Sequence, residues 1–278
     1  MEFNQLLKEK TVTHKEELSE LKFLEILKEK CKNSHKIVIQ VPIFMNTDGE
    51  TYMLVKPAEK EKRSGFWLDQ LIKSFPSWSR YPNRTRCIRG YTTAAQAGGD
   101  DPYAVIPFDT ARVGICPDTS FFRSFKHVEK DFDLKKLDNN GLQSWVTHVS
   151  QGLEKLGEVE LNIDAPNLRL FSHFRGALNK IDKVIQQKRA ELKTMFKKKR
   201  DDLEDEEVTM LSDMLNRHIT NIDQYLEEKL EPEANGFSCI KIESFHNADG
   251  EHEVWTDSPC LLIRRSRYIE LHKKGVIK

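Results

Sequence analysis

The stretch GEHEVWTDSPCLLI, residues 250–263, contains two glutamates one residue apart, followed by an apolar run. In a β-strand, residues i and i+2 point to the same face. Glu251 and Glu253 are therefore expected side by side, with Val254 on the opposite face. The preceding HNADG, residues 246–250, is typical of a loop and would place both carboxylates at the rim of a sheet, where binding sites collect. The pair is either a catalytic device or the polar end of an ordinary strand.

Composition limits the classes of protein to consider. The chain has 278 residues, enough for one large domain or two small ones. Lys plus Arg and Asp plus Glu number 44 each, so the whole chain has no electrostatic reason to bind nucleic acid or an anionic membrane. No run approaches the roughly 20 apolar residues that cross a bilayer, and the first residues lack the apolar core of a signal peptide. We expect a protein of the cytoplasm, or one packaged by something made inside a cell, and no membrane partner.

The cysteines and histidines do not predict a metal site. The five cysteines are odd in number and far apart, with no C-x-x-C pair, which favours free thiols in a reducing compartment. His246 and His252 flank the acidic pair but do not form a metal-ligand pattern, so no metal is expected. Walker A, G-x-G-x-x-G, H-E-x-x-H and G-x-S-x-G motifs are also absent from the sequence.

The N-terminal third predicts one helix and a hairpin. Thr13 and Glu16 have capping-box spacing, and apolar residues then recur on one side of a helix that ends near Asn33. The β-branched run HKIVIQVPIFM, residues 35–45, predicts a strand. After the turn NTDGE, the segment TYMLVKP, residues 51–57, is expected to return as its hairpin partner.

Further strands are expected along the chain, with a helix at 65–75. A short strand is predicted at about 85–91, and two strands, YAVIPF and ARVGICP, are predicted to form a hairpin across DT. FSCIKIESF and EVWTDSPCLLI predict strands at the end of the sequence. Trp67, Trp78 and Trp255 are expected to pack in the core or at its rim.

Residues 166–232 have a different, helical character. Apolar residues recur there at helical spacing on both sides of KKKRDDLEDEE, residues 197–207. Lys197, Lys198 and Arg200 of that run each have an acidic residue four positions later, which favours a solvated helical stretch over a nucleic-acid patch. We favour a helical hairpin, because a single amphipathic helix of this length would need a partner.

Two parts of the sequence resemble a known family. The pattern G-x-S-x-x-x-x-x-S-F at 236–245, followed by E-x-E-V, resembles the C-terminal signature of mono-ADP-ribosyltransferases. WSRYPNRTRCIRGYTTAAQAGG, continuing through YAVIPFDTARVGICPDTSFFRSF, resembles a group of tailed-phage proteins with an ADP-ribosyltransferase-like fold. The resemblance covers about 35–125 and 236–265 and does not include the helical region.

The resemblance implies a specific chemistry. Such enzymes cleave the bond between nicotinamide and ribose in NAD⁺ through an oxocarbenium-like transition state. By position, Glu253 would hold the ribose 2′-hydroxyl and offset the developing positive charge. Glu251 would orient or deprotonate an acceptor, often an arginine. Neither role needs a metal.

Two registers are open for the remaining family motifs. In the first, Thr92–Thr93 matches a Ser/Thr motif that supports the nicotinamide pocket, and Met45 stands where the family has an Arg that grips NAD. Met cannot replace a bidentate, charge-assisted contact, so Arg84, Arg86 or Arg89 would have to substitute. In the second register, which we rank lower, Arg89 of IRG is the family Arg and the Ser/Thr motif moves to Thr119–Ser120. For all three arginines, solvated charge is the alternative interpretation.

We predict an α+β fold in a single domain, residues 1–278. Its expected form is an ADP-ribosyltransferase-like split mixed β-sheet with N-terminal helices and a long helical-hairpin insertion at 166–232. In one reading it is an NAD-dependent mono-ADP-ribosyltransferase, phage-encoded, that acts on host proteins. In the other, catalysis is lost and the protein is an interaction or virion-associated structural protein. Its expected partner is a protein acceptor or a protein bound by the helical insertion, which is also a candidate contact for a homo-oligomer or virion assembly; nucleic acid is not expected.

Overall fold

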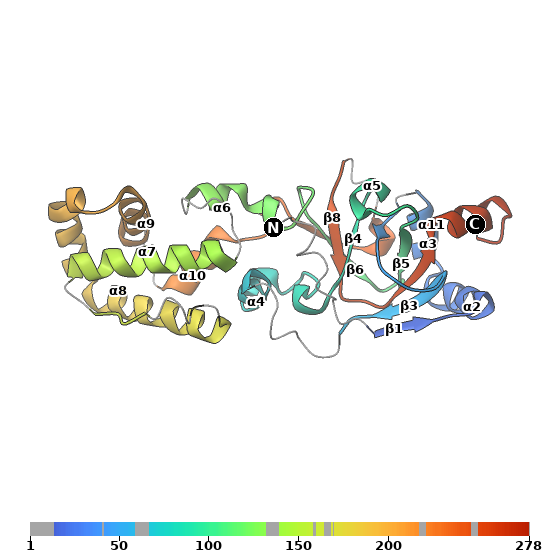
Figure 1. Cartoon of the computed structure of the whole chain (residues 1–278), viewed down its shortest axis with the longest axis horizontal. Helices are drawn as coiled ribbons and strands as arrows, with labels where there is room; N and C mark the ends of the chain where they lie inside the picture. Colours follow the sequence, from blue (N-terminus) through green and yellow to red (C-terminus); the bar gives the residue numbers. More distant parts are fainter. Residues whose placement is uncertain are drawn as a thin grey trace. The chain divides into compact units, whose positions relative to one another are not determined.

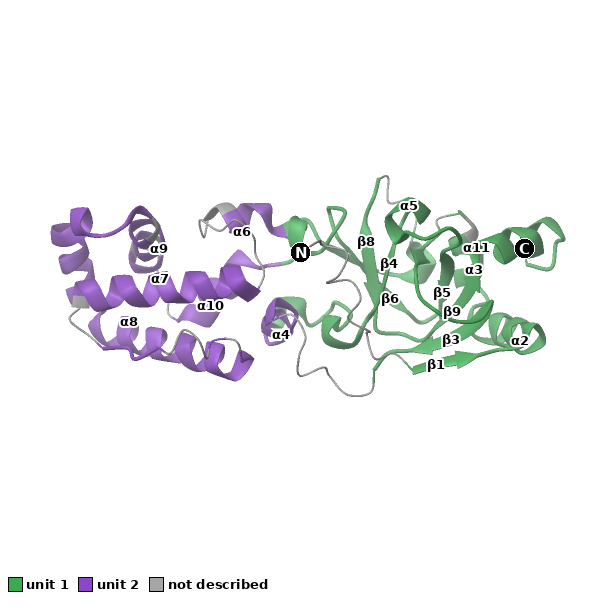
Figure 2. Cartoon of the chain, viewed as in Figure 1, with its two compact units in different colours: residues 1–65, 76–124, 232–278 green, residues 66–75, 125–231 purple. Residues whose placement is uncertain are grey.

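The chain divides into two compact units. The computed structural model describes residues 14–40, 42–58, 67–131, 139–157, 160–163, 168, 170–216, 221–245 and 250–277. Unit 1 comprises residues 1–65, 76–124 and 232–278, and unit 2 comprises residues 66–75 and 125–231; Figure 2 colours them separately. All strands of the described residues lie in unit 1, whereas unit 2 is helical there. No helix of the described ranges is long and apolar enough to cross a membrane.

Unit 1 is built around one antiparallel sheet (Figure 1). Among the described residues its strand order is β1-β3-β9-β5-β2-β4-β8-β6-β7, and every pairing is antiparallel. The α+β class is thus confirmed, while the expectation of a mixed sheet is wrong. The strands are β1 (His14–Glu17), β2 (Phe44–Met45), β3 (Tyr52–Lys56), β4 (Ile88–Tyr91), β5 (Tyr103–Pro107), β6 (Arg112–Ile115), β7 (Ser238–Lys241), β8 (Glu253–Thr256) and β9 (Cys260–Arg264).

The two-residue strand β2 joins two four-stranded halves of the sheet. Both halves contribute to one apolar core, with Val105 and Leu262 from the first half beside Ile88 and Val254 from the second. A second core lies on the other face of the first half, where side chains of α2, α3 and α11 cover the strands. The helices of this unit are α2 (Glu20–Lys30), α3 (Ser34–Gln40), α5 (Ala94–Ala97) and α11 (Arg265–Lys273).

Unit 2 contains the predicted helical hairpin. The long helix α8 ends at Lys199, a 3₁₀ turn at Arg200–Asp202 follows, and the chain returns as α9, which packs against both α8 and α7. The prediction placed the insertion at 166–232 and missed α7, so it covered only part of this unit. The helices are α4 (Trp67–Lys73), α6 (Lys126–Asp131), α7 (Asn139–Gly157), α8 (Phe171–Lys199), α9 (Asp205–Asn216) and α10 (Ile222–Lys229).

The strand predicted at 35–45 is wrong over most of its length. Ser34–Gln40 is the helix α3, and of the other described residues in this segment Phe44–Met45 form the strand β2. Asp109 Oδ1 accepts the backbone N–H groups of Asn33 and Ser34, at 2.9 and 2.8 Å, and so satisfies donors at the start of the helix. Tertiary contacts of this kind override the β-preference of Ile and Val.

Both predicted hairpins are also wrong, although their strands exist. β3 pairs with β1 and β9 instead of with β2, and β5 pairs with β9 and β2 instead of with β6. The helix predicted after the capping box begins later, at Glu20, where the Ser19 side chain caps it and residues 14–17 are a strand. Thr13 of the capping box lies outside the described residues. The helix at 65–75 is confirmed as α4, and the C-terminal strands are confirmed as β7, β8 and β9, although α11 after them was missed.

Candidate functional site

The alternation of side chains along β8 decides where Glu253 lies. Glu253 and Trp255 share one face of the strand, and Val254 packs into the core on the other face. On the neighbouring strand β4, Tyr91 is the register partner of Glu253 and Arg89 is the partner of Trp255. Directly opposite residues of an antiparallel pair point to the same side. Arg89, Tyr91, Glu253 and Trp255 therefore form one surface of the sheet.

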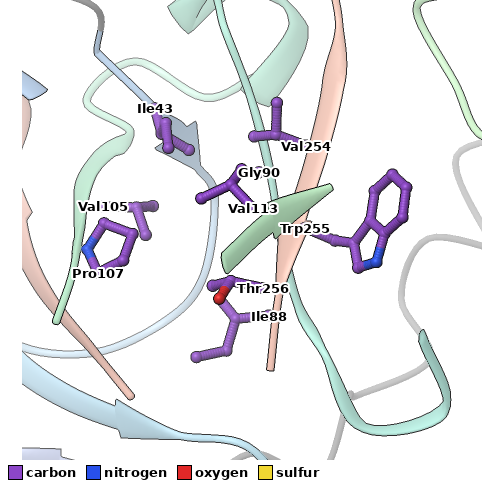
Figure 3. Close-up of a pocket in the computed structure, with 9 residues that line it drawn as sticks. All are labelled: Ile43, Ile88, Gly90, Val105, Pro107, Val113, Val254, Trp255 and Thr256. Carbon is purple, nitrogen blue, oxygen red and sulfur yellow. The ribbon is translucent and has the colours of Figure 1, made fainter. Parts of the chain in front are cut away.

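The core side of β8 offers no room for a ligand at this point. A cavity of about 10 Å³ lies there, enough for about one water molecule. Figure 3 shows the Trp255 ring on the opposite side of the β8 ribbon from Ile43, Val105 and Val113. The residues around the cavity are almost entirely apolar: Ile43, Ile88, Gly90, Val105, Pro107, Val113, Val254, Trp255 and Thr256.

Glu253 is buried and both of its carboxylate oxygens accept hydrogen bonds. Its relative exposure is 6%. Arg84 Nη2 lies 3.1 Å from Oε1, and the backbone N–H of Phe121 donates to Oε2 at 2.9 Å. A carboxylate has about four acceptor positions, so one bond to each oxygen leaves capacity for a further donor. Glu253 is thus fixed in place by two elements that precede it by more than a hundred residues.

Arg84 reaches Glu253 from a 3₁₀ turn, Arg84–Arg86, which Asn83 caps by accepting the Thr85 N–H with its side chain. Its guanidinium carbon lies 3.5 Å from the ring centroid of Phe121 and 4.8 Å from that of Trp255. A guanidinium held against aromatic faces gains cation–π attraction. Asp257 Oδ2 accepts the Asn83 backbone N–H at 3.1 Å and so ties this turn to the residue that follows β8.

An aromatic cluster surrounds the ion pair. Trp78 and Phe121 have ring centroids 5.8 Å apart, Phe121 and Trp255 5.9 Å, and Phe237 and Trp255 6.1 Å. The Trp255 Nε1–H donates to the carbonyl of Pro82 at 2.9 Å, which satisfies its polar atom. The expected packing role of Trp78 and Trp255 is confirmed here, and Trp67 is likewise buried in unit 2, beside Phe174.

Glu251 does not share the strand with Glu253. β8 begins at Glu253, and Glu251 precedes it as an exposed residue, so the predicted pair on one strand is wrong. Thr92 holds the intervening backbone, because its hydroxyl donates to the Gly250 carbonyl and accepts the His252 N–H, both at 2.9 Å. The structure therefore brings Thr92 to the acidic segment, where its hydroxyl binds backbone groups.

The other residues of the first register lie apart from Glu253 or have structural roles. Met45 packs against the apolar core opposite Tyr103. Thr93 caps helix α5, and Arg86 Nη2 lies 3.8 Å from Asp257 Oδ2 at a partly exposed position. These positions assign no cofactor contact to Met45, Thr93 or Arg86.

The elements of the second register also reach Glu253 or its face of the sheet. Arg89 lies on the Glu253 face of β4, and the loop after β6 that carries Thr119–Ser120 runs directly over Glu253. The Glu253 backbone N–H donates to the Asp118 carbonyl at 3.4 Å, and the Asp118 side chain in turn accepts the Thr119 N–H at 2.6 Å. The contact from the Phe121 N–H was missed, because a backbone donor has no signature in the sequence.

Burial and the charge of Glu253 affect two neighbouring groups. Burial raises the pKa of Tyr91, and the Glu253 carboxylate raises it further, so the phenol stays protonated and can donate a hydrogen bond at neutral pH. The pKa of the Cys116 thiol is raised well above its usual value by the same two causes. Cys116 is therefore a poor nucleophile. All five cysteines are free thiols, as expected.

The described residues contain no group of three or more His, Cys, Asp or Glu side chains that could hold a metal ion. His246, which flanks the acidic segment in the sequence, lies outside those residues. No family model matches the chain, and neither the curated proteins nor the solved structures include one that is similar to it.

Proposed function

We propose that this protein is an NAD-dependent mono-ADP-ribosyltransferase with an ADP-ribosyltransferase-like split sheet, phage-encoded and acting on host proteins. The observation that carries the proposal is the convergence on Glu253 of three segments far apart in the sequence. β4 brings Arg89 to its face, the loop 118–121 donates to its carboxylate, and Thr92 holds the backbone that leads into it. The resemblance marks Thr92 in its first register, and Arg89 with the Thr119–Ser120 loop in its second.

The residues around Glu253 have the chemistry that NAD⁺ requires. Arg89 supplies a half-buried cation suited to a phosphate oxygen. Thr119 and Ser120 supply hydroxyls in the loop whose Phe121 N–H donates to the carboxylate, and Tyr91 supplies a protonated phenol. When bound, NAD⁺ would provide the labile bond between nicotinamide and ribose.

Each glutamate would have one task in the reaction. Glu253 would accept a hydrogen bond from a ribose hydroxyl with the acceptor capacity left on its two oxygens, and would offset the positive charge that develops on the ribose. Glu251, exposed at the entry to β8, would act as a base toward the acceptor protein.

The enclosed surroundings of the same carboxylate also favour a second function. The charge of Glu253 is already balanced by Arg84, and the two side chains are 8% and 2% exposed. A pair this well enclosed is also what a retained, inactive fold would contain. In that case the protein would act by binding a partner, with the helices of unit 2 as the candidate surface.

The deciding experiment is the transfer of labelled ADP-ribose from NAD⁺ to proteins of a host lysate. We expect labelling by the wild type and by Glu243→Gln, a matched change at an exposed glutamate in a 3₁₀ turn of the same unit. We expect none with Glu253→Gln. Glu251→Gln should still release nicotinamide from NAD⁺ but no longer label protein, because only its role toward the acceptor is removed.

The opposite outcome is equally informative. If the wild type neither labels protein nor binds NAD⁺ in calorimetry, the transferase activity is excluded. The second proposed function, binding of a partner, would then remain. Equal labelling by the wild type and Glu253→Gln would show that the activity lies elsewhere in the chain.

A further inference from the structure

We propose that Arg84 is a positioning residue: it orients the Glu253 carboxylate for the reaction and does not itself contact NAD⁺. This inference rests on the proposed transferase function. The sequence made Arg84 a candidate to replace the missing cofactor-binding Arg. The positioning role is a different task, because it acts on Glu253 and not on the cofactor.

The guanidinium of Arg84 is engaged by protein groups, which favours an orienting role over direct contact with a ligand. The residue is 4% exposed, and its guanidinium lies against the Phe121 ring with the Trp255 ring close by. The Asn83 cap and the bond from the Asn83 N–H to Asp257 hold the turn from which it projects. Arg89, by contrast, is half-buried on the face of β4 and is the better placed cation for a phosphate.

Two donors fix the carboxylate plane of Glu253. Arg84 Nη2 binds Oε1 and the Phe121 N–H binds Oε2, and the Asp118 carbonyl accepts the Glu253 backbone N–H. The Phe121 side chain packs on the guanidinium that binds the other oxygen. The same residue therefore supports the carboxylate twice, through its backbone and through its ring.

Stability alone does not explain such a pair. Replacing a buried ion pair by apolar side chains of similar volume is often neutral or stabilising. A fixed carboxylate is useful where a charge must meet a reacting atom, because a misplacement of about 1 Å can reduce a rate by about 100-fold. Arg84 orients the carboxylate through its planar guanidinium group, which the two rings enclose. Lysine would supply the same charge but not a planar group.

The test compares Arg84→Met and Arg84→Lys with Arg80→Met. Arg80 lies in the same segment, is mostly exposed and pairs with Glu233 at the surface, so it serves as the matched control. Release of nicotinamide from NAD⁺ is measured at a temperature at which circular dichroism shows each variant folded. We expect kcat to fall by about 100-fold in Arg84→Met with KM unchanged, a smaller loss of kcat in Arg84→Lys, and wild-type values in Arg80→Met.

The outcomes separate this proposal from the function on which it rests. Wild-type kcat in Arg84→Met, or a change in KM alone, would overturn the positioning role while the transferase stands. If Arg84→Met does not fold, Arg84→Lys carries the test, and a wild-type kcat in that variant overturns the proposal. If the wild type is inactive and does not bind NAD⁺, the proposed function fails, and the positioning role fails with it.

Discussion

Two arginine–glutamate clusters of the sheet unit share the same chemistry but have very different surroundings. In one, Arg84 and Glu253 have side chains 2% and 8% exposed, enclosed by aromatic rings. In the other, Arg267 binds Glu20 and Glu270 at the surface, where the three side chains are 26%, 40% and 43% exposed. At the surface, water and salt screen the attraction, so such pairs contribute little to stability. Inside, an unpaired charge is severely destabilising.

The two clusters also connect different parts of the unit. Arg267 on α11 binds Glu20 on α2 and donates to the Tyr52 hydroxyl on β3 at 2.7 Å, so the surface cluster fastens helices to the sheet. Arg84 and Glu253 join a 3₁₀ turn to the face of β8 on which the proposed chemistry takes place. We therefore expect substitutions in the surface cluster to change the free energy of unfolding little, and substitutions in the buried pair to change it strongly.

The largest expected effect follows from removing one partner of the buried pair. Arg84→Met should reduce the free energy of unfolding by about 3–5 kcal/mol, because the Glu253 charge stays buried without its cation. The double variant Arg84→Met with Glu253→Gln should recover part of that loss. Urea denaturation of the wild type, both single variants and the double variant gives the interaction free energy between Arg84 and Glu253. Losses that simply add would show that the two residues act independently and would remove the contrast with the surface cluster.

The sequence predicted part of this site, and the reasons for the gaps are physical. Glu253 and its strand were identified because the acidic pattern precedes an apolar run, and Arg84 was one of three candidate arginines. Its selection depends on the pairing of β4 with β8, and a hydrophobic pattern shows that a strand exists without showing its partner. The same limit explains both wrong hairpins. In α3, the helix depends on Asp109, about 75 residues away, which no local pattern reveals.

A smaller effect is expected from crowding the aromatic wall of the buried pair. A Cβ added to Gly114 would lie 2.3 Å from two atoms of the Trp255 ring, so Gly114→Ala must displace that ring. We expect a loss of about 1–3 kcal/mol in the free energy of unfolding, as for other overpacked cores. Gly176→Ala is the control, because a Cβ there meets nothing within 4 Å; in helix α8 it should stabilise by about 1 kcal/mol. Equal effects of the two changes would mean that the ring has room to move.

The backbone that leads into Glu253 should be more tolerant. Thr92→Val keeps the shape of the side chain but removes two hydrogen bonds, one to the Gly250 carbonyl and one from the His252 N–H. We expect a loss of about 1 kcal/mol and faster hydrogen exchange at the His252 amide. Thr92→Ser keeps the hydroxyl and should behave like the wild type in both measurements. Unchanged exchange in Thr92→Val would show that other contacts hold this segment.

The smallest effect is expected at the surface cluster, and it should depend on pH. Hydrogen bonds from Lys274 and Arg267 lower the pKa of Glu270 from 4.5 to about 2 in the folded protein. A lowered carboxyl pKa stabilises the fold above the unfolded-state value, and this stabilisation is lost as the pH falls from about 4.5 toward 2. The melting temperature of Glu270→Gln should therefore lie slightly below that of the wild type at pH 6, and the difference should vanish as the pH approaches 2. Added salt should reduce the same difference at pH 6, because the cluster is exposed. If the difference persisted at low pH and high salt, Glu270 would act through packing, and the contrast between an exposed and a buried cluster would lose its electrostatic basis.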